Sequence, residues 1–217
     1  MIDTFIFDFD GVFADSKKVI WEGYNHMLKK HNQNTFKTFK EFNEFYTVDF
    51  LKNYERLGFS HHEAERASKM VDSYVTRKKK KVKLFDDMVD FVFGLPHYNC
   101  EGLAYKLGIA SSGTRKYLRS MLKPTGLLEK ISVIVGGDSV KCIKPHPACI
   151  LKCMGELGAY PRKTAFVGDT LVDFEAGKEA GVAKVILVSW GFDDVKFLEN
   201  ANPGNVIYKP EELLQHV

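Results

Sequence analysis

Short apolar segments alternate with helix-like segments over most of this chain, and this alternation limits the possible folds more than any other feature. The first apolar segment, TFIFDF, is rich in aromatic residues and runs into a loop at Gly11. Strands separated by helices form parallel βαβ units. The sequence therefore predicts an α/β fold with a doubly wound, mainly parallel, Rossmann-like sheet. The expected strands are 4–9, 107–110, 131–135, 164–167, 184–188 and 205–208, and the expected helices are 114–123, 145–157 and 173–180.

Residues 14–84 follow a different pattern, with helical periodicity and no clear strand. We expect them to form a helical insertion after the first strand, so that the domains are 1–13 with 85–217, and 14–84. The Phe-rich segment 36–46 is expected to supply core to the insertion, and the basic run 76–83 to be a solvated helix end and linker. The periodic apolar positions are Val19, Ile20, Tyr24, Met27 and Leu28, and then Ala64, Ala67, Met70, Val71 and Tyr74.

Composition indicates a globular protein: of 217 residues, 45% are hydrophobic and 27% charged. The net charge of +3 is too small to indicate a nucleic-acid partner, but it suits small anionic substrates. No apolar stretch approaches the roughly 20 residues that span a bilayer, and no signal peptide is visible. The four cysteines form no CxxC pair, and we expect buried small hydrophobes at Cys100, Cys142, Cys149 and Cys153. We expect a cytoplasmic protein, either monomer or homodimer, that contacts neither membrane nor nucleic acid.

Two groups of acidic residues follow expected strands. Asp8 and Asp10 lie two residues apart, so an extended backbone sends both carboxylates to one side. Asp169 ends the strand near 164–167, and Asp173 follows four residues later as the next helix begins. Ligands of open α/β sheets bind at the carboxyl ends of the strands. Together these acids make an oxygen-rich site of the kind that Mg²⁺ prefers.

A lysine and two serines also follow strands. Lys144, in IKPHP, would offset the repulsion among the acids and bind a phosphoryl oxygen. Ser111 and Ser112 follow the strand LGIA, where a hydroxyl and backbone N–H groups suit a second phosphoryl oxygen. Each signal is weak alone, because a serine after a strand is also an ordinary helix cap.

Taken in order, DFDGV, the serine at 111, the KPxP lysine at 144 and GDTLVD resemble the motifs of the haloacid dehalogenase superfamily. The resemblance extends from the first strand to the VSWG stretch at 188–191. A helical segment after the first strand is similar to members with an α-helical cap, such as phosphoglycolate phosphatase and β-phosphoglucomutase. The resemblance implies a phosphoric monoester hydrolase that uses Mg²⁺ and acts on a small phosphomonoester.

The resemblance also implies a role for each matching residue. Asp8 attacks phosphorus and carries an aspartyl-phosphate, while Asp10 protonates the leaving oxygen and then deprotonates water. Asp8, the backbone carbonyl of Asp10, and Asp169 coordinate magnesium, with Asp173 reached through a water or a hydrogen bond. Phosphate-binding roles fall to Ser111, Ser112 and Lys144.

Other readings remain open. Dehalogenases share the nucleophile but need no acid for a halide, and the presence of Asp10 favours phosphate chemistry. A hexose phosphate mutase of the β-phosphoglucomutase type would use the same core. A phospho-accepting or binding module without catalysis is a further alternative. Candidate substrate contacts are Lys17, Arg56 and Arg115, with Lys52, His61 and His62 as further candidates in the insertion.

Overall fold

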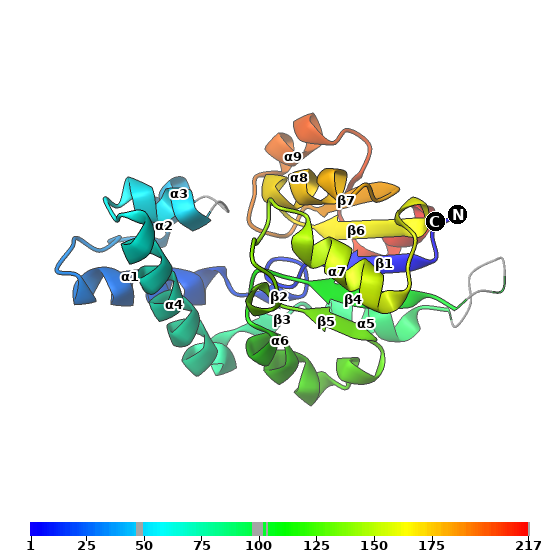
Figure 1. Cartoon of the computed structure of the whole chain (residues 1–217), viewed down its shortest axis with the longest axis horizontal. Helices are drawn as coiled ribbons and strands as arrows, with labels where there is room; N and C mark the ends of the chain where they lie inside the picture. The colour runs from blue at the N-terminus through cyan, green and yellow to red at the C-terminus, as the bar shows by residue number, and fades with distance from the viewer. Residues whose placement is uncertain (47–49, 97–101, 103, 217) are drawn as a thin grey trace. The chain divides into compact units, whose positions relative to one another are not determined.

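In the computed structural model (Figure 1), the described residues are 1–46, 50–96, 102 and 104–216. They divide into two compact units, one made of Met1–Asp15 with Leu84–Val217 and the other of Ser16–Lys83. The first unit contains β1 (Thr4–Phe7), β2 (Ala14–Asp15), α5 (Asp86–Gly94), β4 (Lys106–Ala110), α6 (Arg115–Leu122), β5 (Val133–Val135), α7 (Ala148–Leu157), β6 (Thr164–Gly168), α8 (Leu171–Glu179), β7 (Lys184–Val188), α9 (Val195–Ala201) and β8 (Val206–Ile207). Short 3-10 turns lie at Lys123–Thr125, Leu127–Glu129, Gly137–Ser139, Pro161–Lys163 and Pro210–His216.

A parallel sheet organises this first unit. Its six strands follow the order β5-β4-β1-β6-β7-β8, and each neighbouring pair is parallel. The chain builds outward from β1 through β4 to β5 and then returns to place β6 on the other side of β1. The predicted doubly wound α/β fold is therefore confirmed, with the strand order reversing at β1.

The sheet is buried because helices cover it and its strands alternate apolar side chains between two faces. Ile6 and Phe166 belong to one core cluster with buried residues of α7 and α8, which lie across this face in Figure 1. Phe7 points to the opposite face, where its ring meets that of Phe13 edge-on at 5.3 Å. Burial on both faces explains why the central strands are continuous apolar runs.

Several element boundaries differ from the sequence-based expectation. The first strand ends at Phe7 rather than at residue 9, because the chain turns at Asp10 and Gly11. The helix expected from 145 begins at Ala148, after two prolines. Residues 14–84 were expected to contain no strand, yet β2 and β3 (Lys83–Leu84) pair where the chain leaves and re-enters the first unit. Two-residue strands leave no periodic pattern to recognise.

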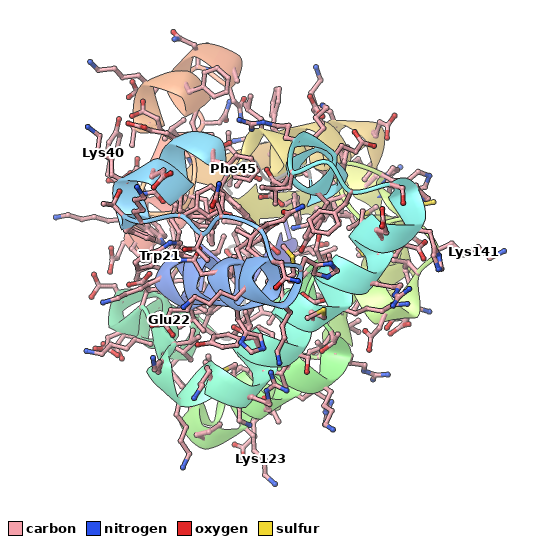
Figure 2. All side chains as sticks on the ribbon, turned by 90° about the vertical axis from the view of Figure 1, so that its left-hand side faces the viewer. Trp21, Glu22, Lys40, Phe45, Lys123 and Lys141 are labelled. Carbon is pink, nitrogen blue, oxygen red and sulfur yellow. The ribbon has the colours of Figure 1, made fainter. Side chains whose placement is uncertain are left out.

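The second unit is helical, with α1 (Lys17–Lys30), α2 (Phe39–Phe45), α3 (Phe50–Arg56), α4 (His61–Lys78) and a 3-10 turn at Lys79–Lys81. The apolar positions expected on α1 are all buried, and α1 packs against α4. On α4, Met70 and Tyr74 are half-buried rather than buried. Figure 2 shows side chains of this unit, with Trp21 and Glu22 beside α1 and Lys40 and Phe45 beside α2.

Aromatic side chains fill the core of the helical unit. Tyr24 and Tyr54 stack with ring centroids 5.4 Å apart, and Phe42 approaches Tyr24 at the same distance. Of the segment 36–46, Phe42 alone is fully buried among the residues described. Lys81, in the basic run, pairs with Glu22 at 2.8 Å, while most other cations of this run are exposed.

The cysteines differ in their surroundings. Cys149 and Cys153 are buried on α7, as expected, whereas Cys142 is exposed in the loop before that helix, so the expectation was wrong for this residue. A loop position has no sheet or helix face to bury it. Cys100 lies outside the described residues. Across the described chain, no helix is both long and apolar enough to cross a membrane.

Candidate active site

The carboxyl ends of β1 and its two neighbours lie side by side. Phe7 of β1 is in register with Ile109 of β4 and Val167 of β6. Asp8 continues this pairing, because its N–H donates to the Val167 carbonyl at 2.8 Å. Residues that follow the three strands therefore converge at the point where strand order reverses, which is the usual ligand site of an open α/β sheet.

Three buried carboxylates meet at this point. Asp8, Asp169 and Asp173 are 7%, 0% and 1% exposed, and one carboxylate oxygen of each lies within 4.8 Å of the others. Like charges so close in a buried setting repel strongly. The cluster therefore needs cations, protons or both.

Lys144 supplies one cation. Its Nζ lies 2.7 Å from Asp8 Oδ1 and 2.6 Å from Asp173 Oδ1. Burial lowers the pKa of Lys144, but the carboxylates of Asp173 and Asp8 outweigh burial and raise that pKa above its ordinary value. The ammonium group thus stays charged at neutral pH, and one positive charge faces three carboxyl groups.

Asp173 uses both oxygens within the protein. Oδ1 pairs with Lys144, while Oδ2 accepts hydrogen bonds from the Thr170 hydroxyl at 2.6 Å and the Asp169 N–H at 3.3 Å. Gly168 permits this approach, since a Cβ there would lie 2.3 Å from the Asp173 Cβ. Asp173 therefore holds the Lys144 ammonium group in position and stabilises the start of α8 through its bond to Thr170.

Asp169 is less completely satisfied. Its Oδ2 accepts from the Phe192 N–H at 2.7 Å, whereas its buried Oδ1 has no hydrogen-bond partner among the described groups. Burial, followed by the charges of Asp173 and Asp8, raises the pKa of Asp169 well above its ordinary value. Burial likewise raises the pKa of Asp8 to about 7, although Lys144 opposes the change. An unpartnered buried oxygen and uncompensated negative charge both fit a divalent cation bound by oxygen ligands.

Asp10 lies beside this cluster but its carboxylate is held separately. The Tyr117 hydroxyl donates to Asp10 Oδ1 at 3.0 Å. Burial, and then the charge of Asp10, raises the pKa of Tyr117 well above its ordinary value, so the hydroxyl keeps its proton at neutral pH. A tight turn follows, in which Gly11 N–H donates to the Ala14 carbonyl at 2.8 Å.

Gly11 has a conformation that favours glycine, with φ at +88°, and a Cβ there would lie 2.0 Å from Asp169 Oδ2. The turn after β1 therefore depends on the absence of a side chain at this residue. In the same turn, the Val12 carbonyl accepts a hydrogen bond from Trp190 Nε1 at 3.2 Å.

Ser111 is buried directly after β4. Its Oγ accepts from the Gly113 N–H at 3.1 Å. A Cβ built on Gly113 would lie 3.5 Å from Ser111 Oγ and 3.6 Å from Asp10 Oδ2, so these two oxygens border the same small volume. Ser112 is half-buried in the same loop. The structure thus brings Ser111 close to Asp10, and Lys144 close to Asp8 and Asp173.

The substrate contacts expected from the sequence belong to both units. Arg115 is exposed at the start of α6, and its backbone N–H donates to Asp138 Oδ1 at 2.9 Å. In the helical unit, Arg56 donates to the Phe45 carbonyl at 2.6 Å and lies over the Phe45 ring. This arrangement joins α3 to α2. Lys17 is half-buried, and the side chains of Lys52, His61 and His62 are exposed.

A shallow hollow of about 260 Å³ also lies in the helical unit, lined by Trp21, Glu22, Asn25, His26, Lys29 and Tyr74. Glu22 accepts from the Tyr74 hydroxyl at 3.3 Å, and Asn25 bonds to the backbone of Phe36. None of the substrate contacts expected from the sequence belongs to this lining.

Some residues of the site were not anticipated from the sequence. Tyr117 was missed because its hydroxyl reaches Asp10 from a helix more than one hundred residues away. Phe192 contributes a backbone N–H, which every residue except proline carries, so its side chain gives no signal. Thr170 had a recoverable signal, since a threonine three residues before an aspartate at a helix start is typical of an N-cap.

Comparison with known proteins identifies the family. The model of haloacid dehalogenase-like hydrolases matches residues 5–188, which include most of β1, all of β4 and β6, and the three buried carboxylates with Lys144. This chain belongs to that family. The resemblance inferred from the motifs is therefore confirmed.

Curated relatives and solved structures both match nearly the whole chain. The pyrophosphatase PpaX of Oceanobacillus iheyensis is 27% identical over 98% of this chain and 95% of its own length, and that of Bacillus cereus is 26% identical with the same coverage. A putative phosphoglycolate phosphatase from Lactobacillus plantarum superposes with a TM-score of 0.86 at 19% identity, over all of both chains. A putative haloacid dehalogenase-like hydrolase from Bacteroides fragilis gives 0.85 at 22% identity, over 98% of this chain and all of its own.

Proposed function

We propose that this family member is a magnesium-dependent phosphatase that hydrolyses a small phosphate compound through an aspartyl-phosphate on Asp8. The observation that carries the proposal is the buried group of Asp8, Asp169 and Asp173, with Lys144 as its one close lysine among the described residues. Oxygen ligands and a fixed cation at the end of a central strand suit phosphoryl transfer, which depends mainly on positioning and charge neutralisation.

Asp8 is the nucleophile in this proposal. Its carboxylate attacks phosphorus, an Asp8 O–P bond forms, and the bond from phosphorus to the leaving oxygen breaks. Covalent catalysis of this kind replaces one slow step by two faster ones. The contact with Lys144 at 2.7 Å holds Asp8 Oδ1, and the same ammonium group is suited to bind a phosphoryl oxygen.

Asp10 is the general acid and base. It gives a proton to the leaving oxygen in the first step and takes one from water in the second, when water attacks phosphorus and the Asp8 O–P bond breaks. Such a group contributes roughly 10²- to 10⁴-fold to the rate. Ser111 and Ser112 would hold the remaining phosphoryl oxygens, with Arg115 and residues of the helical unit such as Lys17 and Arg56 as candidate contacts to the leaving group.

Mg²⁺ would be held by Asp8, Asp169 and the backbone carbonyl of Asp10, with Asp173 reached through a water or a hydrogen bond. When bound, it would neutralise charge that develops on the phosphoryl oxygens. The unpartnered Oδ1 of Asp169 supports this assignment.

The substrate is a small phosphomonoester or inorganic pyrophosphate. The sequence motifs favour a monoester, whereas the nearly full-length relatives named pyrophosphatase favour pyrophosphate. A panel that compares kcat/KM for pyrophosphate and for phosphomonoesters with Mg²⁺ separates the two. Conversion of β-glucose 1-phosphate into glucose 6-phosphate, rather than free phosphate, would instead support a mutase.

The test of the nucleophile is Asp8→Asn, assayed by phosphate release from p-nitrophenyl phosphate and pyrophosphate. We expect a loss of more than about 10³-fold, as for other nucleophile variants. The matched control is Asp90→Asn, which changes an exposed aspartate of α5 in the same unit and should keep the full rate. Near-normal turnover by Asp8→Asn, or full activity in excess chelator, would reject the proposal.

A further inference from the structure

Tyr117 contacts the Asp10 carboxylate, although it lies outside the sequence motifs that carry the family resemblance. Its hydroxyl donates to Asp10 Oδ1 at 3.0 Å, and the residue is 3% exposed. Its ring meets Phe9 edge-on, with centroids 5.8 Å apart. Because the Tyr117 ring is buried and packs against Phe9, the neighbour of Asp10, the direction of the hydroxyl is fixed.

The start of α6 is itself held in place. Thr114 caps the helix, since its Oγ1 accepts from the Tyr117 N–H at 3.3 Å. Asp138, in the loop after β5, accepts from the Arg115 N–H at 2.9 Å. Two side chains thus satisfy backbone donors of the first turn, which would otherwise lack partners. Tyr117 therefore projects from an anchored part of the helix.

The hydrogen bond distinguishes the two oxygens of Asp10. Oδ1 accepts from Tyr117, while Oδ2 borders Gly113, where no side chain intervenes, and lies near Ser111 Oγ. Oδ2 therefore faces the loop expected to hold the phosphoryl group. A partial rotation of the carboxyl group would break the bond to Tyr117 and move the second oxygen away from this loop.

We propose that Tyr117 is a positioning residue, which fixes the Asp10 carboxyl group so that Oδ2 exchanges protons with the leaving oxygen and then with water. This inference rests on the function proposed above and adds a specific residue to it. In the first step the proton moves from Asp10 Oδ2 to the leaving oxygen as the P–O bond breaks, and in the second step Oδ2 takes a proton from the attacking water. The Tyr117 proton stays on its own oxygen throughout.

The leaving group provides a selective test. An alkoxide needs protonation as it departs, whereas p-nitrophenolate departs readily as an anion. We would measure kcat/KM for glycerol 2-phosphate and p-nitrophenyl phosphate in the unaltered enzyme and in Tyr117→Phe, which keeps the ring. Because kcat/KM reports steps up to release of the first product, the later hydrolysis of the aspartyl-phosphate does not contribute.

We expect Tyr117→Phe to lower kcat/KM for glycerol 2-phosphate by about 10- to 100-fold, and that for p-nitrophenyl phosphate by much less, because a misplaced acid matters only where a proton must be given. In an Asp10→Asn background the same change should have no further effect on glycerol 2-phosphate. Tyr160→Phe, which removes an exposed hydroxyl outside the site, should leave both substrates unchanged. Should Tyr117→Phe lose its cooperative unfolding transition, Asp138→Ala should give the same selective loss, smaller in size.

An equal loss with both substrates, or no loss with either, would overturn the role of Tyr117 and leave the proposed function standing. Additive effects of Tyr117→Phe and Asp10→Asn would overturn it as well. A different result would end the proposed function itself, namely an Asp8→Asn variant that hydrolyses both substrates at the unaltered rate.

Discussion

At the scale of single residues, Lys144 offsets the repulsion among the buried carboxylates when no metal ion is bound, and so stabilises the folded protein. It contacts two of the three buried carboxylates, at 2.6 and 2.7 Å, and is itself 6% exposed. Removing one partner from a buried ion pair leaves an uncompensated charge, which is far more costly than losing a surface pair.

Lys144→Met should therefore destabilise the protein in chelator by about 3–5 kcal/mol, measured by urea denaturation at neutral pH. The matched control is Lys152→Met, which removes an exposed lysine of α7 that pairs with Glu156 at 3.0 Å. Its loss should be below about 1 kcal/mol. If both variants lose the same stability, Lys144 does not balance the cluster.

Residues of the site differ in how readily the sequence predicts them. Asp8 and Asp169 are conspicuous because each charged residue directly follows an apolar strand, and Lys144 because it stands in the KPxP motif. Tyr117 has no such signal, since an aromatic residue on an amphipathic helix is usually core, and only the orientation of α6 brings its hydroxyl to Asp10. Roles that depend on three-dimensional direction leave no trace in residue type.

At the scale of elements, the turn after β1 brings the strand end and the β6 loop together. Gly11 has φ at +88°, and a Cβ there would meet Asp169 Oδ2 at 2.0 Å. Gly181, after α8, also has positive φ, at +69°, but a Cβ there would meet nothing within 4 Å. The two glycines share a backbone conformation and differ only in what surrounds them.

Gly11→Ala should therefore lose activity as well as stability, because Asp169 must move, whereas Gly181→Ala should lose only the roughly 1–2 kcal/mol cost of a left-handed alanine. Phosphate release and thermal unfolding of both variants measure the difference. Full activity in Gly11→Ala would mean that the turn does not control the position of Asp169.

Elements of the sheet were easier to predict than the connections around it. The six strands of the sheet are apolar because both faces are covered, and all six were expected from the sequence. Helices α5 and α9 were not, although Asp86 and Asp87 in the first turn of α5 and the Asp194 cap of α9 are helix-start signals. Both are short, with nine and seven residues, so their periodicity is brief.

At the scale of the whole molecule, the buried acids link folding to pH and to metal. A carboxyl group whose pKa is higher in the folded than in the unfolded state binds more protons when folded, so stability falls as pH rises between the two values. Burial raises the pKa of Asp8 from 3.8 to about 7. The contribution of Asp8 to stability therefore decreases between about pH 4 and pH 7. The raised pKa of Asp169 acts in the same direction.

In chelator, the melting temperature of the unaltered protein relative to that of Asp8→Asn should therefore fall between pH 4 and pH 7. Other ionisable groups largely cancel in this comparison, since both proteins share them. Because Mg²⁺ binds ionised carboxylates of the folded protein, saturating Mg²⁺ should abolish this decrease of the melting temperature with pH. Near neutral pH, Mg²⁺ at 100 times its Kd should raise the free energy of unfolding by about 2.7 kcal/mol. Asp169→Asn should lose that gain, because it removes the carboxylate whose Oδ1 lacks a protein partner. If Mg²⁺ does not change the melting temperature at any pH, the acidic cluster does not bind this metal ion.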